Sequence, residues 1–157
     1  MIRLNKVLVA VDFGDASNVA MKYARGLAKM FDASLHVLHV MENLFLRPMA
    51  NDPRAVEAGI TRRLLDVLTD EDRTALHAVP VVRRSDDPAD EIVKYAKEEG
   101  IDLIVMGTHG RPGLAHLLMG SVAEKVVRTA PCPVLTLRYP EHEVVAADAP
   151  AAVPVVQ

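Results

Sequence analysis

Short apolar runs alternate along this chain with segments whose apolar residues recur every three or four positions. Apolar runs that predict strands lie at residues 4–11, 34–40, 75–82, 102–106 and 134–137. Helical spacing fills the intervals between these runs, at about residues 15–28, 55–68, 88–99 and 122–128. A strand buried on both faces reads as a continuous apolar run, and short crossovers through helices join parallel strands. The pattern therefore predicts an α/β fold, an open doubly wound five-stranded parallel sheet with helices on both faces.

Residues that begin, end or interrupt these segments refine the prediction. Before the third helix, Asp87 is placed to cap and Pro88 to occupy the first helical position, and Gly100 ends the segment. Pro80 lies inside a predicted strand, which indicates an edge position because proline cannot donate to a ladder. Ser17 or Asp15 is expected to cap the first helix, and residues 41–53 are expected to form a loop.

The length and composition favour one domain and exclude several classes of protein. A chain of 157 residues can bury a sizeable core, and we expect one domain over 1–139 with a disordered tail over 140–157, which is rich in Ala, Val and Pro. No apolar run approaches the roughly 20 residues that cross a bilayer, and residues 1–6 lack the pattern of a signal peptide. We therefore expect a cytoplasmic protein with no membrane partner.

Charge and side-chain content argue against a nucleic-acid partner and against a structure held by cysteines. The formal net charge of −3 is not concentrated in blocks, and the chain has no Trp, so a nucleic-acid partner is not expected. Cys132 is the only cysteine, which excludes an intrachain disulfide and a thiolate metal cluster. Its place between two prolines before an apolar strand indicates a small buried hydrophobic residue.

A glycine-rich segment after the fourth predicted strand carries the clearest chemical signal. The strand ends at Gly107, the loop contains Gly110 and Gly113, and Gly120-Ser121 leads into the next helix. Backbone N–H groups in such a loop, with the positive end of the helix dipole, favour a bound anion. The segment lacks the lysine of a P-loop, and the first strand is not followed by the glycines of a dinucleotide fold. With these two motifs excluded, the pattern that remains is the spacing Gly-x2-Gly-x9-Gly-Ser.

Together with residues 7–13 near the start and residues 129–135 near the end, this spacing resembles the universal stress protein family over residues 3–139. The resemblance implies the strand order 3-2-1-4-5, which places the switch in strand order between the first and fourth strands. Ligands of open α/β sheets bind at such a switch. Asp12 and the loop that starts at Gly107 would then face each other across one crevice.

The ATP-binding members of that family imply a role for each matching residue. Backbone groups at Ala10 and Val40 would hold adenine, and Asp12 would contact the ribose or phosphate end, or bind it through Mg2+. The glycines would let the loop wrap the ribose and phosphates. The residues that the resemblance assigns to ATP, or a related adenine nucleotide, are Ala10, Asp12, Val40, Gly107, Thr108, His109, Gly110, Arg111, Gly113, Gly120, Ser121 and Val122.

Each of these assignments has a plainer structural alternative. Asp12 could be a turn carboxylate, the glycines ordinary loop residues, Ser121 an N-cap and Arg111 a solvated loop side chain. His109 and His116 lie seven apart with no nearby carboxylate, which is a poor metal signature. His116 also stands where many relatives carry a basic residue, so a neutral imidazole would give less charge to phosphates.

The leading interpretation is a nucleotide-binding regulatory protein of the stress response, with no catalytic set beyond weak ATP hydrolysis. An adenylyl-transferring enzyme is disfavoured because the loop motifs of such enzymes are absent after the first strand. A dimeric interaction protein that binds no nucleotide is the other alternative. A homodimer is expected in either case, through the last strand, whose apolar residues would otherwise leave an exposed edge. That strand comprises Val134, Leu135, Thr136 and Leu137.

Overall fold

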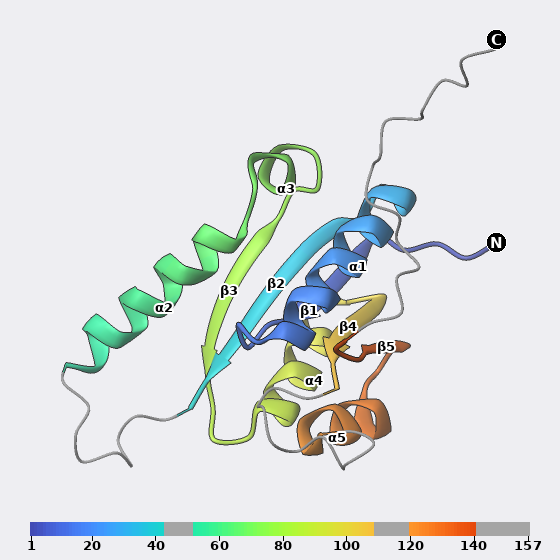
Figure 1. Cartoon of the computed structure of the whole chain (residues 1–157). Helices are drawn as coiled ribbons and strands as arrows, with labels where there is room; N and C mark the ends of the chain where they lie inside the picture. The colour runs from blue at the N-terminus through green and yellow to red at the C-terminus, as the bar shows by residue number, and fades with distance from the viewer. Residues whose placement is uncertain (43–51, 109–119, 141–157) are drawn as a thin grey trace, which may run out of the picture.

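The computed structural model of the chain describes residues 1–42, 52–108 and 120–140. In chain order the elements are β1 (Lys6–Ala10), α1 (Asp15–Phe31), β2 (Ser34–Met41), α2 (Pro53–Val67), α3 (Asp70–Thr74), β3 (Val79–Arg84), α4 (Pro88–Glu99), β4 (Leu103–Gly107), α5 (Ser121–Thr129) and β5 (Val134–Leu137). Figure 1 shows the strands side by side, with α2 lying along β3 at one edge of the sheet.

The strands form one parallel sheet in the order β3-β2-β1-β4-β5, as the family resemblance implied. β1 lies at the centre, where Val7 is in register with Leu35 of β2 and with Leu103 of β4. The strand order reverses beside β1, so the connections that follow β1 and β4 run to opposite faces of the sheet and leave room for a ligand between them.

A separate apolar core covers each face of the sheet. Val7, Val9 and Val37 pack with α1 and α2 on one face, whereas Leu8 and Leu38 pack with α4 and α5 on the other. Adjacent strand residues point to opposite faces, so each central strand contributes side chains to both cores. This explains why the central strands lack polar alternation and confirms the predicted fold class.

Several predicted boundaries are confirmed. The Asp87 carboxylate accepts a hydrogen bond of 3.1 Å from the Asp90 N–H, and Gly100 ends α4 with a left-handed φ of 63°. Pro80 lies in β3, at the edge of the sheet. Cys132, which was expected to be buried, is only half-buried against the α4–α5 core, and burial raises the pKa of its thiol. Within the described ranges, no helix is long and apolar enough to cross a bilayer.

Two predicted features are wrong. Gly14, not Ser17 or Asp15, is the N-cap of α1, because the Ser17 hydroxyl is turned back to accept a hydrogen bond from the Asp12 N–H. The third strand begins at Val79 rather than at residue 75, because the short helix α3 occupies residues 70–74. A capping box between Thr69 and Asp72 starts this helix, and the sequence carried that signal.

Two polar pairs involve buried side chains, those of Asp72, His36 and Tyr95. Arg25 of α1 donates to both carboxylate oxygens of Asp72, at 2.7–3.0 Å, and the Asp72 side chain is only 2% exposed. On the other face of the sheet, His36 Nδ1 lies 2.7 Å from the hydroxyl of Tyr95. Burial lowers the pKa of His36 and raises that of Tyr95 to about 12.

Candidate functional site

A cavity of about 670 Å³ opens at the carboxyl ends of β1, β2 and β4. Its size lies within the range of roughly 300–1,000 Å³ that is usual for small-molecule sites. One wall is the turn after β1, a second is the end of β2, and a third is the end of β4 with the first turn of α5. Ile60 of α2 and Pro88 of α4 complete the lining. The cavity therefore lies at the switch in strand order.

The turn after β1 presents the Asp12 carboxylate at this cavity. Asp12 Oδ1 accepts a hydrogen bond of 2.9 Å from the Gly14 N–H, and the Asp12 N–H donates to Ser17 Oγ at 3.2 Å. The residue is exposed. The turn alternative is thus correct for one carboxylate oxygen, and the described residues give no hydrogen-bond donor to Oδ2, which can serve a ribose hydroxyl or a cation.

Val40 offers backbone groups to the same cavity. Backbone N–H and C=O groups along a strand point to alternate neighbours, so Leu38 and Val40 face the same side of β2. The Leu38 carbonyl accepts the Val11 N–H at 2.9 Å, which identifies this side as the one that faces β1. β1 ends at Ala10. Between the described residues no backbone hydrogen bond joins Val40 to the β1 segment, so its N–H and C=O remain for a ligand.

The first turn of α5 supplies backbone donors. Gly120 is the N-cap, and in the described part of the chain no side chain caps the helix. Ser121, Val122 and Ala123 all line the cavity, and the early N–H groups of a helix have no intrahelical acceptor. The N-cap alternative for Ser121 is wrong, since Ser121 is the first helical residue. A phosphate at this turn would meet both orphan donors and the positive end of the helix dipole.

Backbone hydrogen bonds attach the two ends of the glycine segment to the sheet. The Thr108 N–H donates to the Leu137 carbonyl at 2.8 Å, and the Gly120 N–H donates to the Thr108 carbonyl at 2.6 Å. Thr108 itself is only 5% exposed. The start of α5 is therefore held next to the end of β4, although 11 residues separate Thr108 from Gly120. This geometry fixes the position of the α5 donors.

Gly107 has a packing reason for being glycine. A Cβ atom at this position would lie 2.7 Å from the Ala16 Cβ and 2.8 Å from the Ala16 carbonyl carbon. No such contact is tolerated without movement of α1 or β4. Close approach of α1 to β4 therefore requires glycine here, whatever the cavity contains.

The site residues that the sequence predicts lie together wherever the structure describes them. Ala10, Asp12, Val40, Gly107, Thr108, Gly120, Ser121 and Val122 all line the one cavity. His109, Gly110, Arg111 and Gly113, together with His116, lie outside the described residues. Sequence reasoning missed His39 and Ile60 as lining residues, and it took Ser17 only as a helix cap. Ser17 and His39 lie within a few residues of Asp12 or Val40, and that proximity was the available signal.

Acidic residues lie at the cavity. Asp12 and Glu42 both belong to its lining. Lys125, one turn into α5, is bound to Asp87 at 2.6 Å and to Asp90 at 2.8 Å, so its charge is committed to α4. These contacts hold the pKa of Asp87 below its ordinary value. Among the described residues no group of three or more acidic, His or Cys side chains forms a metal cage. Asp12 fits Mg2+, which often uses one or two carboxylates with phosphates and water.

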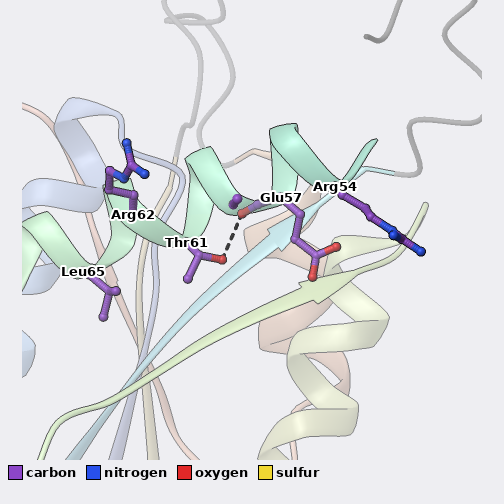
Figure 2. Close-up of a pocket in the computed structure, with 6 residues that line it drawn as sticks. Arg54, Glu57, Thr61, Arg62 and Leu65 are labelled. Atoms are coloured by element: carbon purple, nitrogen blue, oxygen red, sulfur yellow. Dashed lines mark hydrogen bonds between the residues drawn. The ribbon is translucent and has the colours of Figure 1, made fainter. Parts of the chain in front are cut away.

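A second hollow of about 580 Å³ runs along α2 and is unrelated to these residues. Figure 2 shows that its labelled lining side chains all come from α2, with the Thr61 hydroxyl donating to the Glu57 carbonyl at 2.9 Å. Glu57 also pairs with Arg84 of β3. The described residues that line this groove all belong to one helix, whereas the cavity at the sheet ends is lined by residues of several elements.

Comparison with known proteins places the chain in a family. The family model described as the universal stress protein family matches residues 3–138. The chain therefore belongs to the universal stress protein family. A universal stress protein of Methanocaldococcus jannaschii is 34% identical over 149 residues, covering 88% of this chain and 84% of that protein.

Solved structures agree with this assignment. The universal stress protein UspA from Lactobacillus plantarum has a TM-score of 0.68 and 26% identity. The match covers 88% of this chain and 100% of the UspA chain. A universal stress protein solved in complex with cAMP has a TM-score of 0.63 and 25% identity, covering 87% and 98% of the two chains. The second relative holds an adenine nucleotide.

Proposed function

We propose that this protein binds ATP, or a related adenine nucleotide, in the cavity at the carboxyl ends of β1, β2 and β4, and that it acts as a regulatory protein of the stress response. One observation carries the proposal. The residues that the sequence assigned to the nucleotide come from three distant segments, represented by Asp12, Val40 and Ser121. Those that the structure describes line a single cavity of about 670 Å³. Residues without a common function would lie at separate places on the surface.

Each wall serves a different part of the nucleotide. The backbone N–H and C=O of Val40, which bond to no described residue of the β1 segment, supply the donor and acceptor that an adenine edge needs, and Ala10 lines the same cavity. Asp12 accepts from a ribose hydroxyl or holds Mg2+ beside the phosphates. The N–H groups at the start of α5 donate hydrogen bonds to a phosphate. Mg2+, when bound, would neutralise phosphate charge that faces Asp12 and Glu42.

The relative that is solved with cAMP supports an adenine ligand in general. Nothing in the described cavity assembles a nucleophile with a base, so nucleotide-dependent conformation or partner choice is the role that fits. We place a homodimer contact at β5, which is an edge strand with half-buried Val134, Leu135 and Thr136. Pairing of two such edges would satisfy backbone groups that the sheet leaves open.

Titration calorimetry with Mg-ATP, and separately with cAMP, tests the proposal on wild type and Gly120→Val. Gly120 has φ −67° and ψ 154°, an extended conformation that valine adopts without strain. Its new side chain would stand before the α5 donors, so we expect binding to be lost while the melting temperature changes little. Gly59→Val is the matched control, because nothing lies within 4 Å of a Cβ built there. Unchanged binding by Gly120→Val, or no binding of either nucleotide by wild type, contradicts the proposal.

A further inference from the structure

Three side chains from three elements form a stack beside the cavity. The ring of His39, near the end of β2, lies 4.7 Å from the ring of Phe13 at an interplanar angle of 37°. The guanidinium carbon of Arg63, on α2, lies 4.3 Å from the centroid of the same Phe13 ring. His39 lines the cavity itself. The stack thus joins the β1–α1 turn, the end of β2 and α2, whose Ile60 also lines the cavity.

The His39 imidazole also takes a backbone acceptor. His39 Nδ1 lies 2.7 Å from the Val11 carbonyl oxygen. Because a carbonyl oxygen only accepts, Nδ1 must carry the proton and donate. In a parallel ladder, the Val11 carbonyl would be the next acceptor for the Val40 N–H, following the bond from the Val11 N–H to Leu38. Among the described residues the Val11 carbonyl bonds to the imidazole and not to the Val40 N–H, so the β1–β2 ladder ends one step early.

The backbone on the far side of Asp12 is held in an unusual conformation. Phe13 has a φ of +64°, in the left-handed region that is costly for a bulky residue. Such a conformation persists only where the surroundings enforce it. The stack with His39 and Arg63 fixes the Phe13 ring, and the hydrogen bond to Val11 fixes the residue before Asp12. His39 therefore holds the chain on both sides of Asp12.

We infer that His39 is a positioning residue for the nucleotide, an inference that rests on the proposed function. Its Nδ1–H occupies the Val11 carbonyl and so keeps the Val40 N–H available for the adenine edge. Its ring holds Phe13 and thereby places the Asp12 carboxylate at the ribose and phosphate end. A site arranged before the ligand arrives spends less binding energy on ordering. His39 acts through Val40 and Asp12 and needs no contact with the ligand.

Replacement of His39 by leucine removes the donor and leaves the Val11 carbonyl free to accept from Val40. We expect His39→Leu to weaken Mg-ATP binding about five- to tenfold, the effect of one hydrogen bond lost at the site. His39→Asn keeps an N–H near the position of Nδ1 and should recover most of the affinity. His77→Asn is the matched control, since His77 is exposed at the amino end of β3, away from the cavity.

Amide hydrogen exchange of Val40 separates positioning from a general loss of stability. In wild type without nucleotide, the Val40 N–H should exchange quickly and become protected on addition of Mg-ATP. In His39→Leu it should be protected without nucleotide, because it now bonds to Val11. A His39→Leu protein with a lower melting temperature, wild-type affinity and a rapidly exchanging Val40 amide would show a purely structural role and overturn the inference.

A double-mutant cycle with Asp12→Asn gives an independent check. If His39 acts partly by placing Asp12, the effect of His39→Leu on affinity should be smaller in the Asp12→Asn background than in wild type. Fully additive effects, together with an unchanged Val40 amide, overturn the inference. Failure of wild type to bind any adenine nucleotide is a different result and removes the proposed function itself.

Discussion

Replacement of Gly107 by alanine tests how tightly α1 is packed against β4. The added Cβ would lie 2.7 Å from the Ala16 Cβ, 2.8 Å from the Ala16 carbonyl carbon and 3.1 Å from the Ala16 carbonyl oxygen. Two of these three atoms belong to the backbone, which no rotamer change can move aside. The helix or the strand must shift to relieve the contact.

Overpacking of this kind costs about 1–3 kcal/mol. Because the clash involves backbone, we expect Gly107→Ala to fall in the upper half of that range. For a chain of this size the melting temperature should fall by about 4–10 °C. Thermal and urea unfolding, followed by circular dichroism, measure the change.

Two further variants show whether Ala16 is the cause. Adding Ala16→Gly to Gly107→Ala removes the 2.7 Å contact but leaves the 2.8 Å one, so the double variant should recover stability only in part. The coupling energy should be about 0.5 kcal/mol or more. Gly59→Ala in α2 is the control, because open space surrounds its Cβ, and it should stabilise by about 0.5–1 kcal/mol. Equal melting temperatures for Gly107→Ala and wild type would refute the packing argument.

Three other predictions follow from the buried pairs and the sheet edge. Arg25→Met removes the ion-pair partner of the buried Asp72 carboxylate, which keeps its hydrogen bond from the Thr69 N–H, and should cost about 3–5 kcal/mol in urea unfolding. Burial lowers the pKa of His36, so the unfolded chain binds more protons below about pH 6.5, and wild-type stability should fall as pH drops. The melting temperature of His36→Asn should fall less between pH 7.5 and 5.5. Thr136→Lys on β5 should convert a dimer to a monomer in sedimentation.

Hydrophobic patterning predicted most of the fold because every central strand is buried on both faces. Uninterrupted runs such as Val7–Val11 indicate the sheet, and Asp87, Pro88 and Gly100 mark α4 through ordinary capping chemistry. The pattern did not reveal α3, because five residues are too few to show helical periodicity. Strand order came from the family resemblance, since parallel strands with similar patterns can be arranged in several orders.

Site residues could be predicted where a recognisable motif in the sequence marks them. Gly120 and Asp12 were found because a strand end and a helix start are visible in the sequence. His39 was not, because its role depends on reaching the Val11 carbonyl across two strands, 28 residues apart. Gly107 was assigned to ligand approach, whereas its contact with Ala16 is visible only once α1 is packed on β4.

The central claim is that an adenine nucleotide occupies the cavity at the carboxyl ends of β1, β2 and β4. A titration of isotopically labelled protein with Mg-ATP, followed through its backbone amide resonances, locates the ligand directly. We predict the largest shifts at Val40 and at Ser121–Ala123, with little change at the residues that line the α2 groove, such as Arg54, Glu57 and Leu65. Shifts centred on that α2 groove, or no shifts at millimolar Mg-ATP, would contradict the account.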